Sequence, residues 1–157
     1  MEHDTLAFMN LYRVFGYIQA QAWNALPQAG SKQISTLNVR QIKAMMVVYL
    51  RDMEGKAPLT LSQLGDSLGL RKAAMSLLVS DLAEKKLLCR AVDRENRRFI
   101  RITLGIKGRR LGDDITSQAA IHIAEIFGTL TEDERKNFTM IADKIYASYS
   151  HKVEGAE

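Results

Sequence analysis

Residues 89–104, CRAVDRENRRFIRITL, decide the fold that the sequence predicts. The side chains follow the two-residue period of a β-strand over residues 88–92 and again over residues 99–104. Between these runs, in DRENRR (residues 93–98), only Asn96 is uncharged. Because such a tip offers no side chain to a hydrophobic core, the sequence predicts a β-hairpin whose tip projects into solvent or toward a partner.

A short helix, a turn and a longer helix precede this hairpin. Thr60 and Gln63 have the spacing of a capping box, which predicts a helix that begins at Thr60. Gly69 follows where a helix end can adopt a left-handed conformation, at little cost only for glycine. The next helix is predicted over about residues 71–86, with Ala74, Met75, Leu78, Val79 and Leu82 on its buried face. Helix, turn and helix followed at once by a charged hairpin is the winged helix-turn-helix arrangement.

Long amphipathic helices are predicted on both sides of this core. Apolar residues recur every three or four positions over residues 5–26, 39–53, 106–128 and 131–150. A second capping box, Thr131 to Glu134, begins the last of them. We therefore expect a mainly α-helical chain with a small β-hairpin wing. It would form one domain over residues 1–157, with a winged helix core at 38–104 flanked by long helices at 5–26 and 106–150.

Charge is distributed unevenly along the chain. The 157 residues carry a net charge of +4, but residues 71–110 hold twelve Lys or Arg against four Asp or Glu, a local charge of +8 that leaves −4 on the remainder. A basic segment on an otherwise acidic body indicates a surface for nucleic acid, although a basic surface that is merely solvated has the same composition. No apolar run approaches the roughly 18 residues of a membrane span, and the N-terminus lacks the features of a signal peptide. We expect a cytoplasmic protein without a membrane partner.

Few residues suggest catalysis or metal binding. Cys89 is the only cysteine, so no internal disulfide can form. We expect Cys89 to fill a small buried apolar position, the alternative being a redox-active thiol beside Lys86 and Arg90. The histidines lack partners at metal-ligand spacing, and the sequence has neither a nucleophile beside a base nor a glycine-rich phosphate loop. The sequence therefore predicts a protein that is not an enzyme and that binds no metal or cofactor.

Residues 59–111, LTLSQLGDSLGLRKAAMSLLVSDLAEKKLLCRAVDRENRRFIRITLGIKGRRL, resemble the DNA-binding core of the multiple antibiotic resistance regulator (MarR) family. The wing of that family carries an Arg, an Asp and an Arg-Arg pair, followed by a strand and a Lys-Gly step into a long helix. The matching residues are Arg90, Asp93, Arg97, Arg98 and Lys107-Gly108. Long terminal helices extend the resemblance over the whole chain.

The resemblance implies a homodimer, in which the first helix and the last two interlock, bound to a pseudo-palindromic operator in double-stranded DNA. It also implies a repressor whose affinity for DNA falls when a small molecule, such as a small aromatic effector, repositions the two winged cores. The sequence supports the homodimer independently, because the apolar stripes at 5–26, 106–128 and 131–150 are too long for one small winged core to cover.

The candidate DNA-binding residues lie on the second helix of the helix-turn-helix and on the wing. They are Arg71, Lys72, Ala73, Ser76 and Leu77 on the helix, and Arg94, Arg97 and Arg98 on the wing. Asp93 is expected to pair with Arg97 and to fix the direction of the tip, which leaves Arg94 or Arg98 to reach the DNA backbone or the minor groove.

Ala73 and Leu77 are unusual because the family usually has hydroxyl or basic residues at such sites. Either they contact thymine methyl groups, or this helix makes few hydrogen bonds to bases, or Leu77 packs on a neighbouring helix. A second function also remains open, a winged-helix protein interaction module without sequence-specific DNA binding, in which Ala73, Ala74 and Leu77 form a docking surface. The arginine-rich tip favours DNA, because a protein-docking wing has little need for three arginines together.

Overall fold

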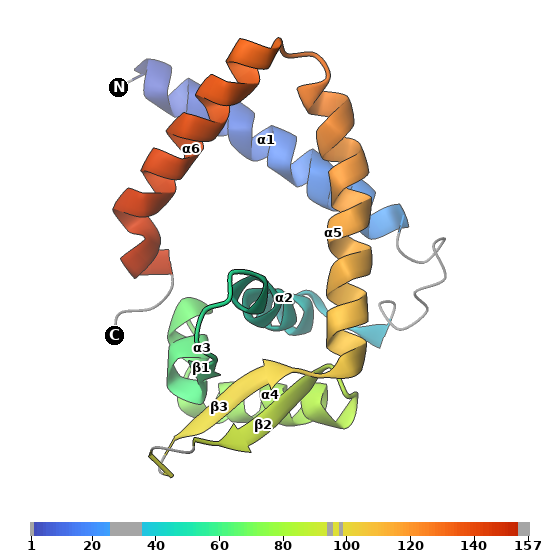
Figure 1. The fold of residues 1–157 in the computed structure, drawn as a ribbon, viewed down its shortest axis with the longest axis vertical. Helices are drawn as coiled ribbons and strands as arrows, with labels where there is room; N and C mark the ends of the chain where they lie inside the picture. The colour runs from blue at the N-terminus through green and yellow to red at the C-terminus, as the bar shows by residue number, and fades with distance from the viewer. Residues whose placement is uncertain (1, 26–35, 94–95, 98, 154–157) are drawn as a thin grey trace.

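The computed structural model describes residues 2–25, 36–93, 96–97 and 99–153 (Figure 1). Its helices are α1 (Glu2–Ala25), α2 (Val39–Met53), α3 (Leu61–Ser67), α4 (Lys72–Glu84), α5 (Ile106–Phe127) and α6 (Glu132–Val153). Its strands are β1 (Leu59–Thr60), β2 (Leu88–Val92) and β3 (Ile100–Leu104). The predicted fold, mainly α-helical with a β-hairpin wing, is confirmed.

Helices α2, α3 and α4 pack with the sheet around one hydrophobic core. The fully buried side chains include Met45 of α2, Leu64 of α3, Met75 of α4 and Ile102 of β3. Leu111, in the second turn of α5, joins the same core. Burial of each such side chain is worth roughly 1.5–3 kcal/mol, so the base of α5 is fixed to the winged core by the same forces that hold the core together.

The sheet has three antiparallel strands in the order β1-β3-β2. Strand β1, which the sequence did not predict, pairs Leu59 with Ile102 and Thr60 with Arg101. A strand of two residues shows no alternation of polarity, so periodicity gives no sign of it. By pairing with β3, this strand fixes the start of α3 to the wing.

The register of the hairpin explains the position of Cys89. Cys89 lies opposite Thr103, while its neighbour Leu88 is buried in the core. Because successive side chains of a strand point to opposite faces, Cys89 must point away from the core. Cys89 is exposed, and the prediction that it is buried is wrong.

Side-chain caps begin three of the helices. Both predicted capping boxes are present: Thr60 N–H donates to Gln63 Oε1 at 2.9 Å, and Thr131 N–H donates to Glu134 Oε2 at 2.8 Å. A third box, not predicted, joins Asn38 to Gln41 at the start of α2. Gly69, after α3, has the predicted left-handed conformation, with φ of +63°.

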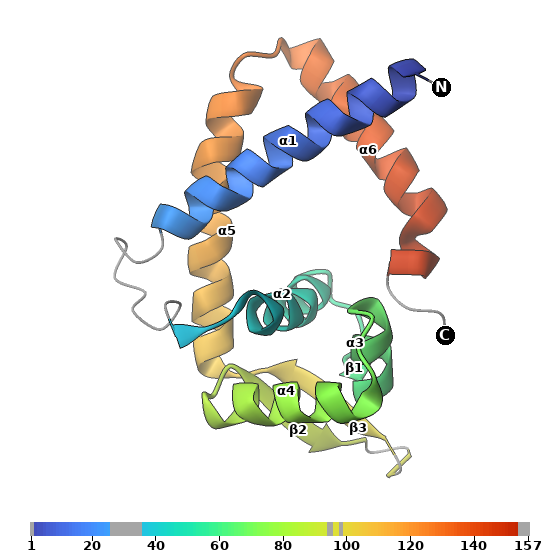
Figure 2. The same ribbon diagram turned by 180° about the vertical axis from the view of Figure 1, so that it is seen from behind.

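Helix α1 and the start of α6 lie at the end of the molecule opposite to α4 and the hairpin, and α6 runs from there back toward α2 and α3 (Figures 1 and 2). Helix α5 joins the two ends, and α1 packs along it. Within the described residues, no helix is both long and apolar enough to cross a bilayer.

Candidate nucleic-acid interface

Helix α4 buries one face and exposes the other. Met75, Val79 and Leu82, spaced by four and three residues, are fully buried. On the other face and at the start of the helix, Arg71, Lys72, Ala73 and Leu77 are exposed and Ser76 is half-buried. The structure thus brings the five candidate residues of this helix to one surface. Arg71 is the N-cap residue, so its charge and that of Lys72 add to the positive end of the helix dipole.

Leu77 is 74% exposed, which is unusual for a leucine in the middle of a helix. The alternative that Leu77 packs on a neighbouring helix is therefore wrong. Ala74, predicted to be buried, is also exposed. The reason is that the buried arc of α4 is narrow, and Ala74 lies outside it because it is rotated by about 100° from its buried neighbour Met75. Ala73, Ala74 and Leu77 together give the exposed face an apolar centre.

At the wing, the Asp93 carboxylate pairs with Arg101 and not with Arg97, which corrects the predicted pair. Arg101 Nε donates to Asp93 Oδ2, and the Asn96 N–H donates to Asp93 Oδ1 at 2.8 Å. Asp93 N–H also donates to the Phe99 carbonyl at 3.0 Å, so Asp93 lies across the hairpin from Phe99. Arg101 of β3 follows Phe99 by two residues, so its side chain lies on the same face of the hairpin as Asp93 and reaches the Asp93 carboxylate diagonally.

Arg101 also connects the wing to the rest of the core. Its Nη1 donates to the Pro58 carbonyl at 3.1 Å, just before β1. The structural role predicted for Arg97 therefore belongs to Arg101. Arg97 is exposed, and the other two candidates of the wing, Arg94 and Arg98, lie outside the described residues.

Arg90 connects β2 to α4, a contact that sequence reasoning missed. Its Nη1 donates to Ser80 Oγ at 2.8 Å, and its Nη2 lies 3.4 Å from Ser76 Oγ. A signal was present in the sequence: the strand period places residue 90 on the same face as Leu88, which is buried against the helices. In the structure this face lies against α4, which the period alone does not determine.

Asp81 holds α4 against α2. Gln41 Nε2 donates to Asp81 Oδ2, and Lys85 Nζ lies 2.9 Å from the same oxygen. Gln41 is the one buried polar residue among the described side chains, and this bond satisfies its amide. The contact fixes the orientation of α4 within the core.

Polar contacts also join α2 to α5. The Tyr49 hydroxyl donates to Asp113 Oδ1 at 2.8 Å and lies 3.3 Å from Thr116 Oγ1. Arg109 of α5 forms an ion pair with Asp52 of α2. The hydrogen bond with Thr116 lowers the pKa of Tyr49, but burial and Asp113 outweigh it, and the pKa of Tyr49 is raised above its ordinary value. The hydroxyl therefore stays protonated and able to donate.

The Lys-Gly step at residues 107–108 has a steric reason. A Cβ at Gly108 or at Gly105 would overlap the backbone of Leu87 or Lys86. The Gly105 N–H donates to the Leu87 carbonyl at 2.9 Å. Two glycines thus let the start of α5 contact the turn between α4 and β2 directly.

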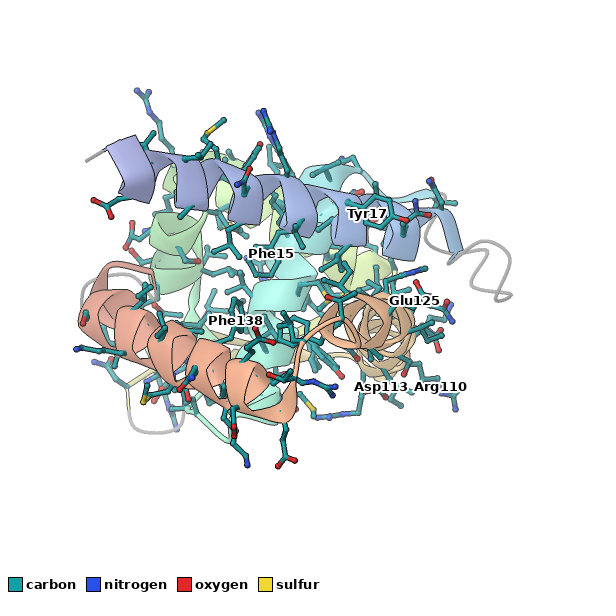
Figure 3. All side chains as sticks on the ribbon, turned by 90° about the horizontal axis from the view of Figure 1, so that it is seen from above. Phe15, Tyr17, Arg110, Asp113, Glu125 and Phe138 are labelled. Carbon is teal, nitrogen blue, oxygen red and sulfur yellow. The ribbon has the colours of Figure 1, made fainter. Side chains whose placement is uncertain are left out.

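Large apolar side chains are exposed along α1 and α6. On α1 they include Leu6, Phe8, Tyr12 and Phe15, and on α6 they include Met140, Ile141, Ile145 and Tyr146. Figure 3 shows Phe15 and Phe138 between α1 and α6, on the sides where these helices face each other. The Phe138 ring meets Phe127 of α5 edge to face, with centroids 5.1 Å apart. Among the described α1 side chains, Ile18 alone is buried.

No cluster of three or more His, Cys, Asp and Glu side chains that is placed to hold a metal ion occurs in the described part of the chain.

No protein-family model matches the sequence, and neither does any curated protein. Solved structures do. A mutant of MepR from a multidrug-resistant S. aureus clinical isolate has 22% identity and a TM-score of 0.73, over 90% of this chain and 96% of the other. A MarR-family transcriptional regulator from Silicibacter pomeroyi has 21% identity and a TM-score of 0.63, over 90% and 88%. S. aureus MepR in complex with DNA has 22% identity and a TM-score of 0.58, over 90% and 97%. The chain therefore has the winged-helix fold of MarR-family transcriptional regulators.

Proposed function

We propose that this protein is a transcription regulator that binds double-stranded DNA sequence-specifically as a homodimer. One observation carries the proposal: α4 exposes Arg71, Lys72 and Leu77 on one surface, and the hairpin with Arg97 extends beside it. An α-helix fits the major groove of B-DNA, where the base edges carry an unambiguous pattern of donors and acceptors. The wing then contacts the backbone or the adjacent minor groove.

The homodimer is supported by the exposed apolar side chains of α1 and α6. Phe8 and Ile145 are 64% and 57% exposed in the isolated chain. Large apolar side chains exposed in this number along two helices are usually buried against another protein. We infer that a second copy of this chain covers this surface, because a twofold axis through it would present two α4 helices to a pseudo-palindromic operator.

We also propose that the protein is a repressor that responds to a small aromatic effector. A cavity of about 200 Å³ supports a ligand site, because it lies between α2 and α6 and its lining includes Val47, Leu50 and Tyr146. Arg51, Glu54 and Ser67 complete the lining together with Leu59, so the cavity has apolar and aromatic walls and a cation that suits the carboxylate of an aromatic acid. Its position between the winged core and α6 would couple binding to the orientation of the core.

A second candidate function rests on the apolar centre of the α4 surface. Exposed Ala73, Ala74 and Leu77 also suit a helix that docks on another protein. The two functions differ in their response to salt, because phosphate contacts release counterions and apolar docking does not.

Fluorescence anisotropy on a labelled random duplex, across a salt series from 50 to 400 mM, tests the proposal, with light scattering to measure the mass in solution. We expect a dimer whose log affinity falls linearly with log salt, with a slope of about −0.9 for each phosphate contacted. Weak binding with a flat salt response would favour the docking module instead.

A further inference from the structure

Arg90 occupies the junction between the two elements that the proposed function assigns to DNA. It lies on β2, opposite Ile102 of β3, and its guanidinium extends to α4. Ser80 and Ser76, one helical turn apart, hold the two terminal nitrogens at 2.8 and 3.4 Å. Arg90 thereby joins the root of the wing to the exposed face of α4.

The charge of Arg90 is not neutralised within the described residues. Three other cations of the same core are each paired with a carboxylate: Lys85 with Asp81, Arg101 with Asp93 and Arg109 with Asp52. Arg90 has two neutral hydroxyls as partners, and no carboxylate oxygen of a described residue lies within 4.0 Å of it. A cation held by neutral groups keeps its full attraction for an anion.

The hydroxyls also fix the position of the guanidinium. A guanidinium has five N–H donors, and Ser76 and Ser80 engage two of them, while the residue as a whole stays exposed. Among the described residues, Arg90 has no further hydrogen-bond partner. Because the side chain is already ordered in the free protein, binding an anion there costs less conformational entropy than ordering a free arginine.

The geometry of B-DNA identifies the anion. The major and minor grooves are separated by one sugar-phosphate backbone. If α4 lies in the major groove and the hairpin tip reaches the adjacent minor groove, the junction between them must straddle that backbone. We propose that Arg90 binds a backbone phosphate at this junction, positioned by Ser76 and Ser80. The proposal rests on the proposed function, and it makes Arg90 a contact for affinity and register and not for base reading.

The experiment compares the full-length wild-type protein with two variants on a labelled random duplex from 50 to 200 mM salt. Arg90→Gln keeps a polar side chain but removes the charge, and Arg90→Lys keeps the charge. Lys136→Gln, on α6 at the opposite end of the molecule, removes one exposed charge as a control. Circular dichroism and the melting temperature establish that each variant is folded.

We expect Arg90→Gln to bind every duplex about tenfold more weakly, because a charge-assisted hydrogen bond is lost. Its salt slope should fall by about 0.9, which makes its loss of affinity over this fourfold salt range about 3.5-fold smaller than that of the wild type. Arg90→Lys should keep the wild-type slope, and so should Lys136→Gln.

Two results would overturn the inference, and only the second would also overturn the proposed function. An unchanged slope in Arg90→Gln, with normal binding by the wild type, would remove Arg90 from the interface and leave the proposed function intact. Wild-type protein that binds no duplex would overturn the proposed function and this inference with it.

Discussion

Leu77 is the residue by which the exposed surface of α4 differs most from a recognition helix with a polar surface. It is 74% exposed, and neighbouring Ala73 is exposed as well. The only apolar group on a base edge in the major groove is the C5 methyl of thymine. A leucine on a helix in that groove therefore makes binding more favourable at thymine. It makes binding less favourable where a polar base edge would be desolvated without a hydrogen bond.

We predict that Leu77 reads thymine through its methyl group. Replacing each thymine of a bound half-site in turn by uracil removes only that methyl, and at the contacted position the wild type should bind about fivefold more weakly, which is about 1 kcal/mol. Leu77→Ala should lose this discrimination and bind the thymine duplex and the uracil duplex equally. Val39→Ala, which truncates an exposed apolar side chain at the start of α2, is the control and should discriminate like the wild type. Equal sensitivity to uracil in Leu77→Ala would exclude the methyl contact.

At the scale of elements, the contact between α2 and α5 sets the direction of α5 relative to the winged core. Gly112 is essential to this contact, because a Cβ there would overlap the Tyr49 ring. Tyr49 cannot move away without breaking its hydrogen bond to Asp113.

We predict that Gly112→Ala lowers the free energy of unfolding by about 1–3 kcal/mol, the usual cost of overpacking a buried contact. Alanine is the better helix former, so in the absence of Tyr49 the same change would stabilise α5. Urea denaturation measures the difference. Ser117→Ala, at an exposed position of α5, should leave the stability nearly unchanged. A Gly112→Ala protein as stable as the wild type would show that the two helices are not closely packed.

The capping box at the start of α6 makes a prediction about pH. The Thr131 N–H and then the Thr131 hydroxyl donate to the Glu134 carboxylate, and they hold the pKa of Glu134 below its ordinary value of 4.5. A carboxylate whose pKa is lower in the folded state adds stability that is present above the unfolded pKa and is lost as the pH falls through the folded pKa.

Wild-type protein should therefore lose more thermal stability between pH 6 and pH 3 than Glu134→Gln does, because the glutamine cannot titrate. Melting curves across this range are the measurement. Glu132→Gln, which removes a carboxylate of the same helix turn, serves as the control. Identical pH profiles for the wild type and Glu134→Gln would mean that the cap does not stabilise the carboxylate.

At the scale of the whole molecule, the winged core and the terminal helices have different surfaces. The exposed face of α4 and the hairpin carry Arg71, Lys72, Arg90 and Arg97, while α1 and α6 expose large apolar side chains. We predict that the apolar surface of α1 and α6 is the dimer interface, and that Phe8→Glu combined with Ile145→Glu gives a folded monomer. Both side chains are exposed in the single chain, so their replacement does not affect its core.

Light scattering at micromolar protein concentration should give the mass of a dimer for the wild type and for Asn10→Glu, an exposed polar position of α1 that serves as the control. The double variant should have the mass of one chain, 17.7 kDa. A double variant that remains dimeric would place the interface elsewhere.

Much of this architecture follows from sequence patterns that act over a few residues. The capping boxes at Thr60 and Thr131 and the left-handed Gly69 depend on neighbours in the chain, and all three were predicted. The errors concern packing between elements. Which face of the hairpin lies against α4 decides both the exposure of Cys89 and the contact of Arg90 with Ser80, and local periodicity does not determine it alone.

The wing shows the same limit at the scale of one ion pair. Asp93 lies four residues from Arg97 and eight from Arg101, so proximity in sequence favoured the wrong partner. The register of the hairpin brings Arg101 to the carboxylate. Arg101 also donates to the carbonyl of Pro58, which directly precedes β1, the strand that the sequence did not predict. On the α4 face, by contrast, the residues chosen from helical periodicity do share one exposed surface.

We propose that two copies of this chain read a DNA sequence through their α4 helices. Selection of bound duplexes from a random library, followed by sequencing, is the measurement that bears on this reading without an intermediate step. We expect enrichment of an inverted repeat whose half-sites lie about one helical turn apart, with thymines at the positions that lose affinity as uracil. Lys72→Ala with Leu77→Ala should lose that enrichment while still binding random duplex through the remaining basic residues. A wild-type pool that stays random after repeated rounds would contradict sequence-specific regulation.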